Sequence, residues 1–203
     1  IKKNCDLDRA RRVVQDCRDA GIMVRTYFVL GFPGETREQI QETLDFAADI
    51  ATDWSNFHIA APLVGTEMYE QMLDRGDIDS TFNWDGAFFR ERQFDTAEIG
   101  AEDLKNTAAS ANLRINFFGN YNLRHGHYER ALRLYEDILE RYPDHMAAQY
   151  CIGLVHRMMG DENAFRAAIE KCKGQLVASQ MAQEHLQLHP ELFPELAGDL
   201  VSA

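Results

Sequence analysis

Residues 24–44, VRTYFVLGFPGETREQIQETL, decide the fold expected for this chain. From Ile22 to Leu30 the residues are nearly all apolar, which is typical of a short strand buried on both faces, as in a parallel sheet. Gly31-Phe32-Pro33-Gly34 follows, and its glycines and proline favour a tight turn. Thr36 and Gln39 then have the spacing of a capping box, which begins a helix. The stretch therefore predicts a strand, a turn and a helix in direct succession.

The same alternation continues on both sides of this stretch. A helix is expected at Leu7–Ala20, with a C-cap glycine at Gly21, and a second strand at Phe57–Ala61 leads into a helix that Gly76 ends. Such alternation predicts an α/β fold with a parallel sheet. Because two strands alone leave edges and a face without partners, we expect further strands upstream or from a second copy. The core-facing stripe of the helix after the turn is Ile40, Leu44, Ala47 and Ala51.

Composition narrows the class of protein. The chain has 203 residues, enough for one large domain or two small ones, and a net charge of −12, which argues against nonspecific nucleic-acid binding. No apolar run approaches the length of a membrane span and no signal-peptide pattern occurs, so a cytoplasmic location is expected. The chain begins at Ile1 without an initiator Met, which we interpret as the start of a C-terminal piece of a longer protein.

The second half of the chain has a helical repeat. Residues 77–98 show no periodicity and predict a long connection, and a helix is expected at Glu102–Phe118. Beyond it, Gly119 and Gly153 are 34 residues apart, the period of tetratricopeptide (TPR) helix pairs. The expected division is residues 1–95 for the α/β part, 96–118 for a connecting helix, 119–176 for TPR-like hairpins and 177–203 for a capping helix and tail. The predicted fold class is thus α/β followed by all-α.

Four short motifs carry a resemblance to a known family. They are KKN before the first helix, AGI entering the first strand, LGFPGET after it, and PLVGTEMY after the second strand. In this order and spacing they resemble the C-terminal half of radical S-adenosylmethionine (radical SAM) enzymes, in the branch that often carries a cobalamin-binding domain. The resemblance spans residues 1–76 and continues weakly to about residue 118. It implies a partial (β/α) barrel with parallel strands.

The resemblance also implies a binding site. The turn after the first strand would lie against the adenine and ribose of S-adenosylmethionine, with Gly31 giving access, Leu30 or Phe32 in apolar contact, and Glu35 holding the loop. The backbone after the second strand would meet the adenine edge. Without the resemblance, the same turn is more typical of a well-capped βα loop that binds nothing than of a ligand site. The cofactor-binding candidates are Leu30, Gly31, Phe32, Gly34, Glu35, Pro62, Leu63 and Val64.

The chain departs from the family at the iron–sulfur cluster. The family binds a [4Fe–4S] cluster through a C-x-x-x-C-x-x-C loop, and the cluster reductively cleaves S-adenosylmethionine to a 5′-deoxyadenosyl radical. Here the four cysteines, Cys5, Cys17, Cys151 and Cys172, are scattered and predict free thiols. We expect S-adenosylmethionine and the cluster to serve the parent protein, with cobalamin as a further candidate. The isolated chain should be inactive, and no catalytic residue is assigned.

Other candidate residues leave alternatives open. His58 in the second strand either points into the barrel towards a substrate or is a hydrogen-bonded core histidine. His185 and His189 are four residues apart, but Pro190 disfavours helical geometry and a surface pair is preferred over a metal site. The acidic stretch Asp74, Asp77, Asp79 and Asp85 is expected to be a solvated loop. The alternative function is a non-catalytic module that binds a protein partner through the TPR-like helices.

Overall fold

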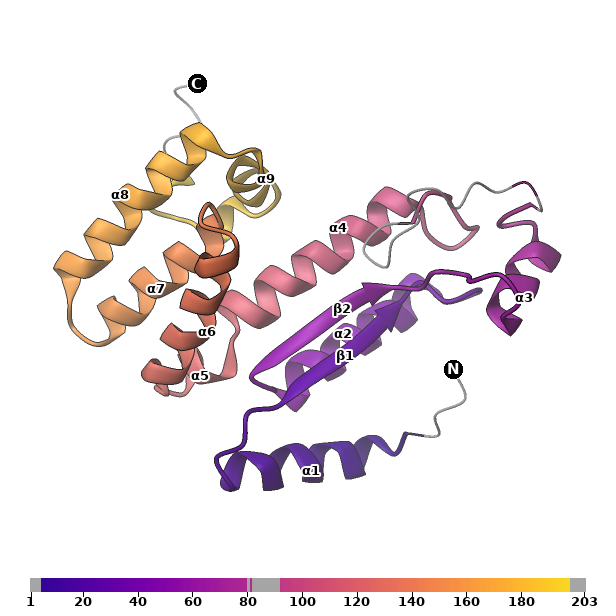
Figure 1. The fold of residues 1–203 in the computed structure, drawn as a ribbon, viewed down its shortest axis with the longest axis horizontal. Coiled ribbons are helices and arrows are strands. Elements are labelled where there is room, and N and C mark those ends of the chain that lie inside the picture. Colours follow the sequence, from indigo (N-terminus) through magenta and orange to yellow (C-terminus); the bar gives the residue numbers. More distant parts are fainter. Residues whose placement is uncertain (1–4, 80, 82–91, 198–203) are drawn as a thin grey trace. The chain divides into compact units, whose positions relative to one another are not determined.

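The chain divides into two compact units. The structure is a computed structural model. It describes residues 5–79, 81 and 92–197. The units are residues 1–115, which contain the strands, and residues 116–203, which are helical where described (Figure 1). The predicted order of α/β followed by helices is confirmed at this level. The acidic residue Asp85 of the connection lies outside the described residues.

The first unit is built around a parallel pair of strands. Strands β1 (Arg25–Leu30) and β2 (Trp54–Ile59) pair in register, with Phe28 opposite Phe57 and Leu30 opposite Ile59. The parallel arrangement predicted from the alternating pattern is therefore confirmed within the described residues. The helices of this unit are α1 (Leu7–Asp19), α2 (Arg37–Ile50), α3 (Glu67–Arg75) and α4 (Ala101–Ala111).

The core of this unit lies on one face of the strand pair. Leu30 and Ile59 project from the strands and pack with Ile40 of α2 and Leu104 of α4, and all four side chains are at most 2% exposed. Figure 1 shows α2 running along β1 and β2. Because side chains alternate between the two faces of a strand, the residues next to Leu30 and Ile59 belong to the opposite face.

The opposite face is open, which contradicts the prediction of a strand buried on both faces. Tyr27 is 68% exposed and Arg25 is also exposed. The strand begins at Arg25 rather than Ile22, because Ile22 closes the end of α1 by donating its backbone N–H to the Cys17 carbonyl at 2.8 Å. The apolar run was therefore a helix end followed by a half-buried strand.

The bounds of β2 and the last residue of the core-facing stripe of α2 differ from those expected. Strand β2 is Trp54–Ile59 rather than Phe57–Ala61. Its first half contains polar residues, and the buried Ser55 hydroxyl is satisfied by the hydroxyls of Thr26 at 3.0 Å and Thr52 at 3.2 Å. Ala51 does not belong to the stripe of α2, because it is the C-cap with φ of 49°, and Ile50 is buried in its place.

The helix ends expected from local sequence are confirmed. The Thr36 hydroxyl accepts the backbone N–H of Gln39 at 3.3 Å, and the Gln39 side chain accepts the backbone N–H of Thr36 at 3.0 Å. Gly21, with φ of 74°, donates to the Arg18 carbonyl at 3.0 Å, and Gly76 ends α3 with φ of 73°. These positions need the left-handed conformation that glycine adopts without strain.

The second unit is a succession of packed helices. They are α5 (Tyr121–Arg124), α6 (Tyr128–Arg141), α7 (Met146–Met158), α8 (Glu162–Ala178) and α9 (Gln180–Leu188), followed by a 3₁₀ turn at Pro190–Leu192. The helix expected at Glu102–Phe118 is α4 continued by a π-helical stretch, Asn112–Phe118. None of the helices in the described part of the chain is long and apolar enough to cross a bilayer.

Close helix packing explains one of the repeated glycines. A Cβ on Gly153 of α7 would lie 2.8 Å from the Ala168 Cβ of α8. Ala131 and Tyr135 of α6 are fully buried, and the Tyr135 hydroxyl donates to the Phe117 carbonyl at 2.8 Å. Small residues at helix crossings thus have the packing role that the 34-residue pattern requires, although the TPR assignment itself stays a prediction.

Candidate functional site

A pocket lies at the carboxyl ends of the two parallel strands. Its volume is about 790 Å³, within the usual range for small-ligand sites. The turn after β1 forms one wall, and the segment from the end of β2 into α3 forms the other. The open face of the sheet contributes through Val29 and His58. The lining includes Val29, Phe32, Pro33, His58, Leu63 and Thr66.

Glu35 holds the turn after β1 in place. One carboxylate oxygen, Oε2, accepts the backbone N–H of Gly31 at 2.5 Å and that of Phe32 at 3.1 Å. The Glu35 backbone N–H in turn donates to the Phe32 carbonyl at 2.9 Å. The carboxylate is therefore folded back on its own loop, as the sequence predicted, and Phe32 is held against the pocket.

The structure gives Gly31 a different reason for being glycine from the one the resemblance implied. Its φ is +83°, and a Cβ there would lie 2.5 Å from Leu104 Cδ2 of α4. The free side of this glycine thus faces the protein core. Leu30 is also fully buried in that core, so Phe32 is the apolar side chain of the turn that lines the pocket.

Two arginines that the sequence did not single out support the turn. Arg92 is 6% exposed, donates from Nη2 to the Ile99 carbonyl at 2.6 Å and makes a long contact of 3.5 Å from Nη1 to the Gly31 carbonyl. Burial lowers the pKa of the Arg92 guanidinium. Arg75 lies against Gly34, whose Cβ would be 3.4 Å from Arg75 Nη1.

Arg75 is itself held by carboxylates. It donates to Asp77 at 2.8 Å and to Glu98 at 2.6 Å. Both carboxylates come from the aperiodic connection between α3 and α4, so the expected solvated loop is wrong for Asp77, whose side chain is 6% exposed. No periodicity or motif marks these residues: Asp77 lies two residues after Arg75, and Glu98 lies 23 residues after it.

His58 lies on the open face of the sheet at the pocket. Its ring stacks on that of Tyr27, with ring centroids 5.9 Å apart and an angle of 8° between the planes. It is partly exposed and lines the pocket, so it is not a buried core residue. A role for His58 towards a substrate stays a prediction.

The second wall brings in the segment after β2. Leu63 lines the pocket and is 52% exposed, and its carbonyl accepts the Thr66 hydroxyl at 2.6 Å. Thr66 also caps α3 by accepting the Tyr69 backbone N–H at 3.2 Å. Pro62 is buried, and Val64 is 66% exposed beside the pocket rather than in its lining.

A second hollow of about 730 Å³ lies on the other side of the turn. Gly34 and Glu35 line it together with Cys5 and Phe46. The candidate residues from the sequence are therefore divided between two surfaces of one turn. Phe32 lines both, as does its neighbour Pro33.

The cysteines do not fit an iron–sulfur cluster. Cys5 is exposed and Cys17 partly buried in the first unit, whereas Cys151 and Cys172 are buried in the second. Within residues 5–79, 81 and 92–197, no group of three or more His, Cys, Asp or Glu side chains is placed to hold a metal ion. The described residues therefore offer no set of three thiolates.

The interpretation of His185 and His189 as a surface pair is wrong. His189 is 8% exposed and its Nδ1 lies 3.2 Å from Glu191. His185 packs beside His145, with ring centroids 5.0 Å apart. Burial, helped by the neighbouring histidine, lowers the pKa of His145 to about 4, and burial lowers that of His185 to about 4 as well.

Part of this chain is similar to radical SAM methyltransferases and methylthiotransferases, which supports the radical SAM family. Over 85 residues it is 29% identical to the cytidylyl-2-hydroxyethylphosphonate methyltransferase of Streptomyces wedmorensis, covering 39% of this chain and 16% of that protein. Over 71 residues it is 34% identical to an uncharacterized methyltransferase, PH0819, of Pyrococcus horikoshii, covering 35% of this chain and 15% of that protein.

A third relative is matched over a longer segment. The bacteriochlorophyllide d C-12(1)-methyltransferase of Chlorobaculum tepidum is 28% identical over 98 residues, which cover 48% of this chain and 21% of that protein. The matches thus span about a fifth or less of these relatives' lengths. No family model and no solved structure matches the chain.

Proposed function

We propose that this chain supplies the adenosine-side wall of an S-adenosylmethionine site in a radical SAM enzyme that uses 5′-deoxyadenosyl radical chemistry. The observation that carries the proposal is the pocket at the carboxyl ends of β1 and β2, in a chain partly similar to radical SAM methyltransferases. In α/β folds, ligands bind at this edge of the sheet. The [4Fe–4S] ligands would come from a part of the enzyme that is not in this chain, and cobalamin is a candidate second cofactor through the branch resemblance alone.

In this proposal each wall of the pocket has its own task. Phe32, fixed through its backbone by Glu35, packs against the purine, and Leu63 closes the opposite side. Backbone groups of Pro62–Val64 meet the adenine edge. Gly31 and Gly34 act indirectly, by letting the turn pack on Leu104 and Arg75. His58 on the open face would be the nearest imidazole to a substrate entering the same pocket.

S-adenosylmethionine binding tests the proposal directly. We expect saturable binding to the chain that Phe32→Ala weakens about tenfold, the loss expected for one aromatic contact with a base. Tyr142→Ala is a matched control, because Tyr142 is a 45% exposed aromatic of the second unit that does not line the pocket. Equal affinities of the Phe32 variant and the wild type would remove the assignment of the turn.

The gene tests the enzymatic part. A C-x-x-x-C-x-x-C loop encoded upstream of Ile1 would support the enzyme, and anaerobic reconstitution of that longer protein should then give a brown, cluster-containing product. A start codon without such a loop would leave only the non-catalytic alternative.

The alternative function is a protein-interaction module, and one observation favours it. Residues 116–203 form a compact unit of their own, with a core that includes fully buried Tyr135, Met146 and Leu196. We propose that this unit binds a protein partner through its helices. Cross-links between a co-purifying partner and residues 116–197 would support this role, and cross-links confined to the first unit would contradict it.

A further inference from the structure

The second unit carries a short segment that packs on its helices after α9. It covers residues 190–197, PELFPELA, and we call it the 190–197 segment. Phe193 and Leu196 in it are fully buried. Its backbone hydrogen bonds are local: the N–H of Phe193 donates to the Pro190 carbonyl at 3.1 Å, that of Leu196 to Phe193 at 2.9 Å, and that of Leu192 to His189 at 3.0 Å. The segment therefore has its own local turn and docks through side chains.

The first docking contact is an aromatic pocket. The Phe193 ring meets Tyr150 of α7 edge-to-face, at 5.2 Å and 79°, and meets Phe118 at 5.1 Å and 90°. Phe118 and Tyr150 also contact each other, at 5.7 Å. Edge-to-face contacts of this kind favour an aromatic ring over an aliphatic side chain of similar size. The pocket therefore selects the type of side chain that enters it.

The second docking contact is a carboxylate clamp. The Tyr150 hydroxyl donates to Glu195 Oε2, and Arg157 Nη1 donates to Glu195 Oε1 at 2.8 Å. Burial acts to raise the pKa of Glu195, but the hydrogen bonds from Tyr150 and Arg157 outweigh it, and the pKa is lowered. A charged carboxylate is thus the species that the clamp holds.

Arg157 is also held by groups outside the 190–197 segment. Its guanidinium lies over the Phe165 ring, 4.1 Å from the centroid, and its Nε donates to Glu162 at 3.3 Å. Both partners belong to α8, not to the 190–197 segment. Arg157 is therefore oriented by α8 as well as by the segment, and rigid donors lose less entropy on binding.

We propose that Phe118, Tyr150 and Arg157 form a peptide-binding site, and that the 190–197 segment occupies it in cis. The partner is a protein segment with an aromatic residue two positions before a carboxylate and an aliphatic residue directly after it. This is the chemistry of Phe193, Glu195 and Leu196. The inference deepens the protein-interaction role proposed above and does not depend on S-adenosylmethionine binding.

A displacement experiment tests the site on the full chain. The probe is a fluorescent peptide PELFPELA with blocked ends, and the measurement is its anisotropy. Glu195→Gln removes the charge from the segment but leaves the receptor intact, so this variant should bind the peptide about tenfold more tightly than the wild type does. Adding Arg157→Ala to it should abolish that gain. A peptide with Gln in place of its second Glu should bind neither chain measurably.

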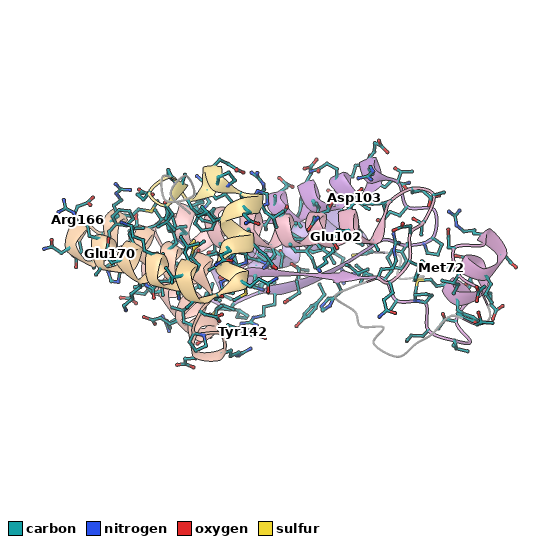
Figure 2. All side chains as sticks on the ribbon, turned by 90° about the horizontal axis from the view of Figure 1, so that it is seen from above. Met72, Glu102, Asp103, Tyr142, Arg166 and Glu170 are labelled. Carbon is teal, nitrogen blue, oxygen red and sulfur yellow. The ribbon has the colours of Figure 1, made fainter. Side chains whose placement is uncertain are left out.

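A matched control is available on α8. Arg166 is exposed and points outward in Figure 2, so Arg166→Ala in the Glu195→Gln background should leave peptide binding unchanged. Circular dichroism checks that each variant is folded. Should Glu195→Gln fail to fold, Phe193→Leu loosens the segment from its own side and allows the same comparison.

Two results would overturn the proposal. If a folded chain with a loosened segment does not bind the peptide, the 190–197 segment is a permanent part of the core. If the peptide binds equally well after Arg157→Ala, the clamp is not the site. If a co-purifying partner cross-links to the second unit in both the wild type and the Arg157→Ala variant, that result contradicts this site and still supports the broader protein-interaction role.

Discussion

The two units of this chain differ in how completely their central strands and helices are covered. In the first unit, Tyr27 of β1 is 68% exposed on a sheet whose other face is packed, and Ile22 at the end of α1 is 56% exposed. In the second unit, Tyr135 and Tyr150 are at most 1% exposed. A strand needs partners on two edges and two faces, whereas stacked helices bury each other with neighbours close in sequence. The open face of the sheet also lines the pocket, through Val29 and His58.

The largest effect is expected where the packed face of the sheet meets the turn. Gly31→Val would place a β-branched residue at φ of +83° and a Cβ 2.5 Å from Leu104 Cδ2. Together the left-handed conformation and the overpacking should lower the free energy of unfolding of the first unit by about 4 kcal/mol. Urea unfolding followed by a probe in that unit measures it.

Gly65→Ala separates the cost of the left-handed conformation from the cost of overpacking. Gly65 has φ of +82° but nothing within 4 Å of the added Cβ, so this variant should lose only about 1–2 kcal/mol. Equal losses for Gly31→Ala and Gly65→Ala would mean that the turn is not packed against α4. Because Gly31→Val unfolds the wall of the pocket, it is a poor test of ligand binding.

The second unit should be sensitive to acid. The unfolded-state pKa of a histidine is about 6.5, and that of His145 in the folded unit is about 4. The folded state therefore binds fewer protons, and its stability is present above pH 6.5 and lost as the pH falls towards 4, by about 3 kcal/mol for this histidine.

His145→Asn tests the acid sensitivity. Asparagine keeps a side-chain acceptor at the N-cap of α7, where His145 accepts the Ala148 backbone N–H, but it does not titrate. Thermal unfolding between pH 7 and pH 4 should show a shallower pH dependence for this variant. His125→Asn, at an exposed position, is the control and should follow the wild type. Parallel pH curves for His145→Asn and the wild type would contradict the prediction.

A smaller effect is expected from the capping box of α2. Thr36→Ala removes the hydroxyl that accepts the Gln39 backbone N–H and should cost about 1 kcal/mol of stability. Thr43→Ala removes a hydroxyl that donates to the Gln39 carbonyl in the middle of the same helix, and it should be neutral within about 0.5 kcal/mol. If Thr43→Ala and Thr36→Ala lower the stability equally, the capping hydroxyl contributes no more than a hydroxyl in the middle of the helix.

The smallest effect concerns a surface ion pair within the first unit. Arg37 of α2 lies 2.6 Å from Asp103 of α4, and both side chains are more than half exposed. Solvent screening limits such pairs, so Arg37→Ala should cost less than about 1 kcal/mol, and less at high salt. A double-mutant cycle with Asp103→Ala at two salt concentrations measures it, and a salt-independent coupling would contradict the screening argument.

The sequence by itself determined where several of the helices begin or end. The Thr36–Gln39 box, the glycine after α1 and the glycine after α3 are all satisfied within a few residues, so local spacing was enough to predict them. It also predicted the parallel strands and the turn that holds Phe32. The bounds of β1 and β2 were less accurate, because an apolar run does not show which of its residues end a helix.

Only the tertiary structure decided which face of β1 is open, why Gly31 is glycine, and which side chains hold the turn. Arg92 contacts Gly31 across 61 positions of sequence, and Tyr150 reaches Glu195 across 45. Such contacts depend on how separate elements pack, and no periodicity in either segment records its distant partner. Local hydrogen bonds can be predicted from neighbouring residues, but a pocket is made by residues that meet only after folding.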